Sequence, residues 1–469
     1  MKKIAVLALS LVWAVCPLMA QNEVETTEEK LAADYFSALY GDKDTVRAEF
    51  LKSELLEKYP RGAFARRLSA ESVNGAADSV EYMARCDAFR RDFPISGWLE
   101  APDGSGFVYM NFYRSYSQFL YQKGLWDKLR QVLPEMTYSM LADLYSHGPM
   151  FLIMKAPIDP KEYVDISEDI IRNMWEKKDC NPDMYGGGKI MPADGSMDYY
   201  LAVETEILQR SGRPAEAVEC MDRADAAVRY NQYADGNESY IKALEELGRH
   251  DDAVTALFGA TAVGRLTPEL FSMLRNHYNS LDEKPAGTFD AYYESLKTET
   301  ARENLRNDVM AGMVDVPYEN FSLTSIGGKK VESAGFGPDD IVVLDFWATW
   351  CAPCIAALEG MQLAVDKYAD DRNVHFYFIC TQDEPDRKRV RNVWKRGGYR
   401  NMTVLFDENR EGSEGHDKVY RSIIKGTSGI PQKAVLKDGR IRYIAEGYGG
   451  SPSGLMDEIS AVIEILKAE

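Results

Sequence analysis

The feature that most constrains the fold is an apolar run that leads directly into two closely spaced cysteines. Ile341 to Ala348 has the sequence IVVLDFWA, with Asp345 as its one charged residue. An apolar run of this length is typical of a strand that a sheet buries on both faces. Cys351-Ala352-Pro353-Cys354 follows, and apolar residues then recur at helical spacing from Ile355 to Tyr368. The pattern predicts a buried strand, a turn with two cysteines, and a helix.

The surrounding residues extend this unit to an α/β domain over residues 313–469. Apolar runs predict strands at Val374 to Cys380 and Met402 to Phe406, with a helix between them at Arg387 to Lys395. Asp438-Gly439 lies between two strand-like segments and is a strong hairpin signal. A closing helix carries its apolar residues on one face. Before the dithiol, the sequence predicts a short opening hairpin with arms at Val316 to Leu323 and Gly327 to Val331.

Residues 21–312 have the pattern of helices joined by short breaks. Leu208 to Val218 returns as Leu244 to Val254, 36 residues later, and each copy has a helix end, a Gly turn and a new helix. From Tyr199 to Tyr278 this pattern resembles tetratricopeptide repeats, which form concave protein-binding surfaces. A plain helical array that supports the other domain explains the pattern equally well. The Gly- and Pro-rich stretch from Cys180 to Met197 predicts a loop.

Length and charge agree with two soluble domains and narrow the partners. The 469 residues exceed the roughly 250 to 300 at which a single core stops growing. A net charge of −19 would repel a phosphate backbone, so we expect no nucleic-acid partner. Proteins or small molecules remain as the expected partners.

The first twenty residues have the pattern of a secretory signal. Lys2 and Lys3 precede an apolar run from Ile4 to Val15, and Ala20 offers a small residue for cleavage. We therefore expect residues 1–20 to be removed and the mature protein to lie in the periplasm or cell envelope. Cys16 offers an alternative, a lipoprotein anchored through that residue. No other apolar run approaches the ~18 residues that cross a bilayer.

The cysteines do not form a disulfide scaffold or a metal site. Only Cys351 and Cys354 are close in sequence, and tetrahedral zinc needs two further ligands that no second Cys pair or close His pair supplies. We predict no metal and no cofactor. Cys380 ends an apolar strand and is expected to pack in the core. The sequence leaves the pairing of three others open: Cys86, Cys180 and Cys220.

The predicted position of Cys351, between a buried strand and a helix, favours a reactive thiolate. Unpaired backbone N–H groups at a helix N-terminus stabilise an anion, so Cys351 should attack a disulfide and Cys354, one turn further, should resolve it. Lowering a thiol pKa from about 8.5 to about 7 stabilises the anion by roughly 2 kcal/mol. Ala352-Pro353 adds no side-chain donor that would stabilise it further. We therefore expect a reducing couple, which makes the protein a reductase.

Asp345 is a carboxylic acid in a strand that is otherwise apolar. Burial of a carboxyl group costs several kcal/mol unless the group is neutral or hydrogen-bonded, so such a residue points to function. Burial should raise its pKa and let it accept the Cys354 proton as a mixed disulfide resolves. The strand from Val374 to Cys380 contains no Lys that would oppose the shift. A structural Asp that caps a neighbouring backbone group is the alternative.

Two segments carry a resemblance to a known superfamily. Asp345 to Cys354, DFWATWCAPC, resembles the active-site segment of the thioredoxin superfamily, and Gly429-Ile430-Pro431 resembles its cis-proline loop. The opening segment from Val316 and the long insert from Gln382 to Ile424 resemble the exported TlpA/ResA branch. The resemblance covers about 155 residues, a third of the chain.

The resemblance implies roles for individual residues. It implies a redox disulfide between the nucleophile Cys351 and the resolving Cys354, with Asp345 as the buried acid. It also implies that Pro431 is cis, and that Ile430 offers its backbone to a substrate strand. Trp350 would shield the pair, and the substrate-binding surface would include Ala352 and Pro353. An exported reductase needs electrons from across the membrane, so the resemblance further implies a membrane thiol carrier as a partner.

The expected function is therefore an exported thiol:disulfide oxidoreductase that reduces protein disulfides through its CAPC dithiol. In this interpretation the helical region selects substrates or partners. The alternative reverses the emphasis: the helical region is a protein-binding module and the thioredoxin fold is non-catalytic. The intact cysteine pair together with Asp345 favours the enzyme.

Overall fold

The computed structural model describes residues 27–155, 158–193, 195–410, 412 and 415–469. The predicted signal sequence, residues 1–20, and Cys16 lie outside this part of the chain. The chain divides into two compact units. One unit comprises the residues up to Tyr116 together with Pro182–Ile190, and the other comprises Ser117–Asn181 and Met191–Glu469.

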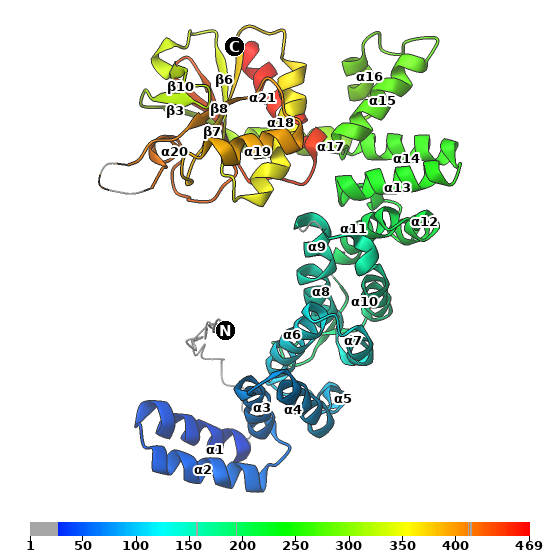
Figure 1. Ribbon diagram of the computed structural model, residues 1–469, viewed down its shortest axis with the longest axis vertical. Coiled ribbons are helices and arrows are strands. Elements are labelled where there is room, and N and C mark those ends of the chain that lie inside the picture. Colours follow the sequence, from blue (N-terminus) through cyan, green and yellow to red (C-terminus); the bar gives the residue numbers. More distant parts are fainter. Residues whose placement is uncertain (1–26, 156–157, 194, 411, 413–414) are drawn as a thin grey trace. The chain divides into compact units, whose positions relative to one another are not determined.

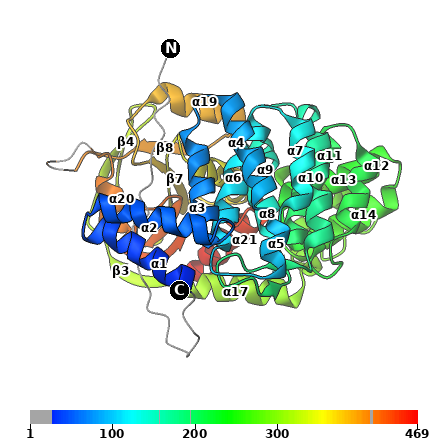
Figure 2. The same cartoon turned by 90° about the horizontal axis from the view of Figure 1, so that it is seen from below.

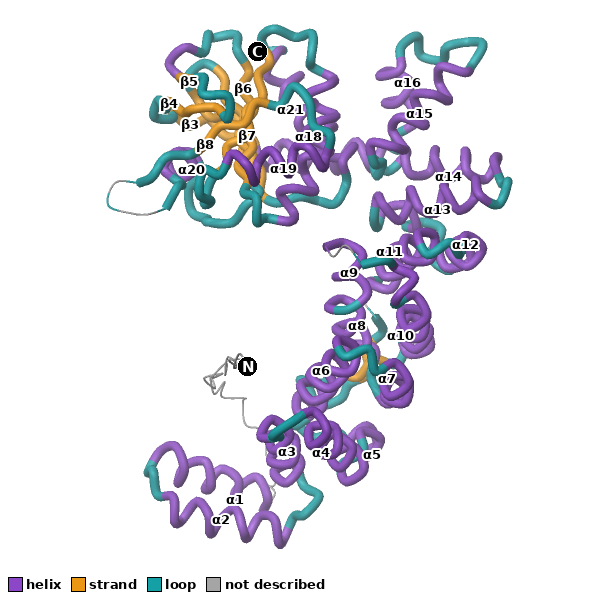
Figure 3. The backbone as a smooth tube through the Cα atoms, in the orientation of Figure 1, coloured by secondary structure: helices purple, strands orange, loops and turns teal. Residues whose placement is uncertain are grey.

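An all-helical region precedes the large sheet, as the sequence predicts (Figure 3). No helix in the described part of the chain is both long and apolar enough to cross a membrane. The predicted loop after Cys180 contains two short paired strands, β1 (Asn181–Pro182) and β2 (Ile190–Met191). The helices of the region are α1 (Thr27–Phe36), α2 (Thr45–Lys58), α3 (Ala63–Ser72), α4 (Ser79–Asp92), α5 (Ile95–Glu100), α6 (Gly106–Gln122), α7 (Trp126–Val132), α8 (Tyr138–His147), α9 (Pro149–Lys155), α10 (Val164–Lys177), α11 (Ser196–Arg210), α12 (Pro214–Asp222), α13 (Ala234–Glu246), α14 (His250–Ala262), α15 (Pro268–Ser280), α16 (Phe289–Leu296) and α17 (Glu299–Gly312).

The two copies of the sequence repeat form the helix pairs α11–α12 and α13–α14, which lie side by side (Figure 2). Each pair turns at a glycine in the left-handed region, Gly212 at φ 79° and Gly248 at φ 72°, where an L side chain would be strained. Pro214 starts α12, a position that needs no backbone N–H donor. The local chemistry of the repeat therefore sets where these helices begin and end.

The change from helices to the sheet falls between α17, which ends at Gly312, and β3, which begins at Met313. The two compact units, by contrast, meet within α6. We therefore propose residues 21–312 and 313–469 as the two domains from the change in secondary structure, whereas the two compact units divide the chain elsewhere.

The C-terminal region contains, among the described residues, an eight-stranded sheet in the order β3-β10-β9-β6-β7-β8-β4-β5. Strands β6, β7 and β8 run parallel, and the other neighbours pair antiparallel. Helices α18 and α21 lie on one side of the sheet and α20 on the other (Figure 1). The elements are β3 (Met313–Pro317), β4 (Ser322–Ser325), β5 (Lys330–Glu332), β6 (Ile341–Trp347), α18 (Ala352–Lys367), β7 (Val374–Cys380), α19 (Arg387–Gly397), β8 (Thr403–Phe406), α20 (Lys418–Ile423), β9 (Gln432–Lys437), β10 (Arg440–Glu446) and α21 (Pro452–Lys467).

The central strand β6 is buried along its whole length, as its apolar run predicts. Successive side chains point to opposite faces of a sheet. Phe346 contacts Tyr420 of α20, with ring centroids 5.4 Å apart, whereas Trp347 contacts Trp394 of α19 at 5.0 Å. Asp345 alternates with Phe346, so it faces the same side as Trp347, the side that α18 and α19 cover.

The predicted opening hairpin is wrong in its first arm. Val316 and Pro317 belong to β3, which pairs with β10 at one edge of the sheet. Strands β4 and β5 form the hairpin at the opposite edge. Pro317 cannot donate a ladder hydrogen bond and therefore suits an edge strand. The hairpin predicted around Asp438-Gly439 is confirmed, and both residues have the positive φ that a tight hairpin turn requires.

The last helices of the helical region are fastened to α21 within the second compact unit. Leu266 and Ser453 exchange two hydrogen bonds, from Leu266 N to Ser453 Oγ at 2.9 Å and from Ser453 N to Leu266 O at 3.1 Å. Asp457 forms an ion pair with Lys297 at 2.9 Å and accepts a hydrogen bond from Tyr293, also at 2.9 Å. All three side chains of this second contact are buried, so the attachment is more than a flexible linker.

Candidate active site

A disulfide joins Cys351 to Cys354 at the start of α18, with their Cα atoms 5.3 Å apart. Cys351 occupies the position before the helix, and its sulfur accepts a hydrogen bond from the backbone N–H of Cys354 at 3.3 Å. Cys351 keeps 4% of its surface exposed, whereas Cys354 keeps none. Cys351 is therefore the sulfur that a partner reaches first, and a thiolate there would meet the unpaired N–H groups of the helix.

The peptide bond between Ile430 and Pro431 is cis, and it lies beside the disulfide. The carbonyl oxygen of Ile430 is 3.7 Å from the sulfur of Cys351. The carbonyl oxygen of Pro431 accepts a hydrogen bond from the backbone of Gly447 at 2.9 Å. This contact holds Pro431 in place next to Ile430, whose carbonyl oxygen faces the sulfur of Cys351.

Exposed side chains surround Cys351 on its other sides. Trp350 is 60% exposed, and its indole N–H donates to the carbonyl oxygen of Gln382 at 3.1 Å. Ala352 and Pro353 are also exposed. The sequence-predicted substrate-binding residues therefore gather around one sulfur.

Asp345 is buried without a hydrogen-bond partner. It is 1% exposed, and neither of its carboxyl oxygens accepts a hydrogen bond from a described residue. Burial raises the pKa of the carboxyl group to about 6, and the positive charge of Lys433 opposes part of that rise. This residue does not cap a neighbouring backbone group, which was the structural alternative. A buried acid that titrates near neutral pH is suited to proton transfer.

Lys433 is the residue that the sequence analysis missed. It lies on β9 directly opposite Asp345 on β6, and it is 1% exposed. Directly opposite residues share one face of the sheet, with Cβ atoms about 4.5–5.5 Å apart. The ammonium group donates to the carbonyl oxygen of Gly447 at 2.8 Å. The cation lies on β9 and not on β7, the strand in which the sequence shows no Lys. A charged residue in an apolar strand is the signal that identified Asp345, and Lys433 carries the same signal.

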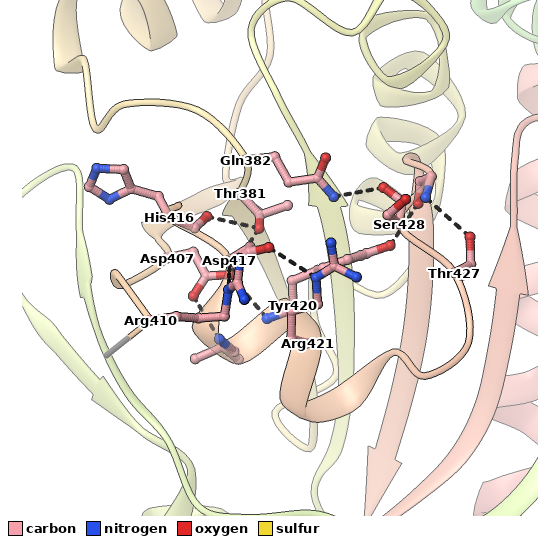
Figure 4. A network of polar contacts seen from close by, with 12 residues as sticks. Thr381, Gln382, Asp407, Arg410, His416, Asp417, Tyr420, Arg421, Thr427 and Ser428 are labelled. Carbon is pink, nitrogen blue, oxygen red and sulfur yellow. Dashed lines mark hydrogen bonds and ion pairs between the residues drawn. The ribbon is translucent and has the colours of Figure 1, made fainter. Parts of the chain in front are cut away.

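A polar network behind the site positions the cis-proline loop (Figure 4). Asp407 accepts hydrogen bonds from the backbone N–H groups of Val419 and Tyr420 at the start of α20, at 2.8 and 3.0 Å. The hydroxyl of Tyr420 in turn donates to the carbonyl oxygen of Gly429 at 2.8 Å. The long insert predicted from the sequence therefore has a structural role, because its helix holds the residue next to Ile430.

Gln382 joins the two segments that flank the dithiol. Its backbone carbonyl accepts from Trp350, and its side-chain amide donates to the carbonyl oxygen of Ser428 at 2.8 Å (Figure 4). Its φ of 54° places the residue in the left-handed region. Thr349 is held similarly, because its backbone N–H donates to Asp383 at 3.0 Å. No local sequence signal identifies these contacts, which depend on residues more than thirty positions apart.

The other described cysteines are thiols and do not join the site. Cys86 and Cys220 are buried, and Cys180 is exposed. Cys380 is buried at the end of β7, and burial raises the pKa of its thiol to about 12. A thiol that ionises so rarely at neutral pH packs as an apolar residue, in line with its predicted role.

Residues 314–444 match the model of a protein family described as the AhpC/TSA family. No curated protein matches the chain significantly. Among solved structures, the chain is similar to a thioredoxin family thiol:disulfide interchange protein of Chlorobium tepidum, with 21% identity, 32% of this chain and 97% of that chain covered, and a TM-score of 0.26. It is also similar to an exposed lipoprotein thioredoxin of Streptococcus pneumoniae (22%, 31% and 99%, TM-score 0.25) and a secreted disulfide oxidoreductase of Mycobacterium tuberculosis (19%, 31% and 95%, TM-score 0.24).

The family match identifies the fold that surrounds the disulfide. The C-terminal region is a thioredoxin-like domain, and it carries a C-x-x-C pair at the start of a helix. The match begins at residue 314 and leaves the helical region uncovered. The chain thus combines a thioredoxin-like domain with an N-terminal helical region.

Proposed function

We propose that this protein is an exported reductase of protein disulfides that works through the Cys351–Cys354 pair. In the reduced protein, the Cys351 thiolate attacks one sulfur of a substrate disulfide and releases the other as a thiolate. Cys354 then attacks Cys351 in the mixed disulfide, so the substrate leaves as a dithiol and the protein keeps the disulfide. Two electrons pass from the protein to the substrate.

The observation that carries the proposal is that three features meet at one site. The more accessible cysteine of a C-x-x-C disulfide, a helix N-terminus and a cis X-Pro backbone meet at Cys351. The helix end stabilises the attacking and leaving thiolate. The Ile430 backbone offers hydrogen-bonding groups to an extended substrate segment, so it would align a polypeptide across the sulfur.

Asp345 is the proposed acceptor of the Cys354 proton. Cys354 is fully buried, so its thiol cannot pass its proton directly to solvent. Asp345 is likewise buried, and its pKa of about 6 leaves it mostly ionised at pH 7. An ionised carboxylate with no hydrogen-bond donor binds a proton readily. The acid is thus ready to take the proton at the step in which the mixed disulfide resolves.

Trapping tests the assignment of the two cysteines. In Cys354→Ser the mixed disulfide cannot resolve, so this variant should accumulate covalent partners through Cys351. Cys351→Ser retains only the buried thiol and is the matched control, with weak trapping expected. Non-reducing gels with insulin as the substrate measure both. Equal trapping by the two variants would contradict the assignment.

Redox titration tests the direction. Ala352-Pro353 adds no donor to the Cys351 thiolate, so we expect a reduction potential below about −200 mV, toward the reducing end of the thioredoxin-like range. Equilibration of the full chain with glutathione or dithiothreitol buffers measures it. A value above about −150 mV would refute the reductase while leaving dithiol chemistry intact.

Export and the electron donor are parts of the same proposal. The N-terminal pattern of Lys2, Lys3 and an apolar run supports removal of residues 1–20, and Cys16 supports the alternative of a lipid anchor. Outside the cytoplasm, a membrane thiol carrier would return electrons to the pair. N-terminal sequencing of the mature protein distinguishes the two forms, since cleavage after Ala20 exposes Gln21.

We also propose that the helical region selects partners for the dithiol. Its attachment supports this role, because Arg265, three residues after the end of α14, donates to the carbonyl oxygen of Gly449. Gly449 lies two residues from Gly447, whose N–H holds Pro431. Removal of residues up to 195 should slow trapping of native partners while leaving insulin reduction intact. Unchanged partner trapping would favour a purely supporting role for the helices.

A further inference from the structure

The helix α19 carries a concentration of positive charge in an acidic chain. Residues 387–400, RKRVRNVWKRGGYR, contain seven Arg or Lys residues and no Asp or Glu, whereas the whole chain has a net charge of −19. All seven side chains are exposed: Arg387, Lys388, Arg389, Arg391, Lys395, Arg396 and Arg400. The basic residues therefore form one positive surface, which we call the basic helix surface.

The helix buries its apolar side and leaves the charges in solvent. Val390 and Val393 are buried, and Trp394 packs on Trp347 of β6 and on Phe378 of β7, with ring centroids 5.0 and 6.1 Å apart. Among the described residues, only Arg389 of these seven forms ion pairs, with Asp386 at 3.4 Å and Asp383 at 3.7 Å. The protein's own acidic groups therefore leave most of this charge unneutralised.

The basic helix surface begins at the edge of the sheet that carries the dithiol. Strands β6 and β7 run parallel, and α19 starts seven residues after the end of β7, so its first turn lies at the same end of the sheet as Cys351. Asp383 connects the two directly, since it contacts Arg389 and accepts the backbone N–H of Thr349, two residues before Cys351. Positive charges in this position would attract or repel a charged molecule that approaches the sulfur of Cys351.

We propose that the basic helix surface docks an acidic segment of the substrate protein next to the disulfide to be reduced. This inference rests on the proposed function, because it names the class of protein disulfide that the site takes. An acidic segment would be repelled by most of this chain and attracted to α19. Such complementarity raises association rates by about 10- to 1000-fold at low salt and orients the partner as it arrives. The redox step is the one given above, with two electrons passing to the substrate disulfide.

Peptide substrates of opposite charge test the proposal. We would use the reduced full chain and two synthetic peptides that share one disulfide loop, one flanked by four Asp and the other by four Lys. Stopped-flow measurement gives the second-order rate constant for each. We expect the acidic peptide to react at least about tenfold faster at low ionic strength, and the ratio to approach one as salt screens the charges.

Paired charge reversals locate the effect. Arg387 and Arg391 are one helical turn apart and near the dithiol, so Arg387→Glu/Arg391→Glu should lower the ratio of acidic to basic peptide rates about tenfold. Lys329→Glu/Lys330→Glu is the matched control, with the same change in net charge. Lys330 begins β5, the edge strand four places from β6 in the sheet, and Lys329 precedes it, so both lie roughly 19 Å to the side of the strand that leads to Cys351. This control should keep the parental ratio.

Each outcome decides between the proposals. A ratio near one in the parent, or an equal fall in both double variants, would overturn docking at α19. Failure of the parent to reduce hydroxyethyl disulfide, which is small and uncharged, would instead contradict the proposed function. If the peptides react equally but vesicles with anionic lipid bind the parent and not Arg387→Glu/Arg391→Glu, the occupant is a membrane surface and the docking proposal is wrong.

Discussion

Two acids, one in the C-terminal sheet and one in the helical region, are equally buried but differ in their hydrogen bonds. Asp345 in the sheet and Glu204 in α11 are each 1% exposed, and burial raises the pKa values to about 6 and about 7. Glu204 Oε2 accepts hydrogen bonds from the hydroxyls of Tyr145, at 2.8 Å, and Ser167. Neither carboxyl oxygen of Asp345 has such a partner among the described residues.

The difference lies in what the surrounding protein supplies. Tyr145 lies on α8 and Ser167 on α10, so Glu204 ties three helices together. An acid with hydroxyl partners is part of the structure, because its removal leaves those partners without an acceptor. An acid without partners adds nothing to stability and is free to exchange its proton. The hydrogen bonds, rather than burial itself, therefore distinguish Glu204 from the proposed proton acceptor Asp345.

The largest expected effect is on turnover in Asp345→Asn. The amide cannot accept the Cys354 proton, so resolution of the mixed disulfide at pH 7 should slow about a thousandfold, the middle of the range for a positioned proton acceptor. Quenched-flow decay of a Cys351-linked peptide measures it. The loss should shrink at alkaline pH, where hydroxide can take the Cys354 proton in place of Asp345. A loss that is independent of pH would indicate a structural role instead.

The same substitution should raise stability. The pKa of Asp345 is raised in the folded protein, so its contribution to stability is full below about pH 4 and is lost as the pH rises through about 6. At pH 7 Asp345→Asn of the oxidised protein should therefore be more stable, by about 3 kcal/mol. Urea unfolding at pH 4 and pH 7 measures the difference between variant and parent. No gain at pH 7 would mean that Asp345 has hidden partners.

Glu204 should respond in the opposite direction. At pH 4, below the pKa of about 7 that burial gives Glu204, its carboxyl is neutral and only the hydrogen bonds are lost in Glu204→Leu, which should lower the free energy of unfolding by about 2 kcal/mol. Glu204→Gln keeps an acceptor oxygen and is the matched control, with a much smaller loss. Far-UV circular dichroism during urea unfolding follows the helices. If Glu204→Leu were as stable as the parent, the distinction between the two acids would fail.

The smallest effect is expected for Lys433→Met, which removes the charge beside Asp345 together with the hydrogen bond to Gly447. The cation lowers the pKa of Asp345, so its loss should raise that pKa and move the rising limb of the pH–rate profile upward. A shift of about one pH unit corresponds to about a fivefold loss at pH 6 and almost none at pH 8. Equal losses at both pH values would show that the Gly447 contact, rather than the charge, matters.

Local patterns predicted the parts of the molecule that depend on neighbours in sequence. The strand β6, the helix after Cys351 and the turn at Asp438-Gly439 follow from burial period and turn chemistry, and the structure confirms them. The pairing of β3 with β10 joins residues more than 120 positions apart, so a local pattern could not give it. The first arm of the predicted hairpin failed for that reason.

The candidate site shows the same division. The cysteines, Asp345 and the loop at Pro431 carry signals in their own segments, and the family resemblance adds their roles. Lys433 could have been found, because a charged residue in an apolar strand is itself a signal. Gln382 could not, since its importance lies in two contacts with Trp350 and Ser428 that only the folded chain brings together.

The buried contact between Lys297 and Asp457 has a consequence for how a client would reach the sulfur. Separation of such a pair leaves charges stranded in the core and costs roughly 3–5 kcal/mol, so the last helices rarely swing away from α21. The last helices therefore hold a fixed position against α21 and do not act as a flexible tether. A protein bound by α14 to α16 would therefore meet Cys351 in one fixed orientation. A flexible tether would instead let the bound protein approach the sulfur in many orientations, at an effective concentration set by the tether length.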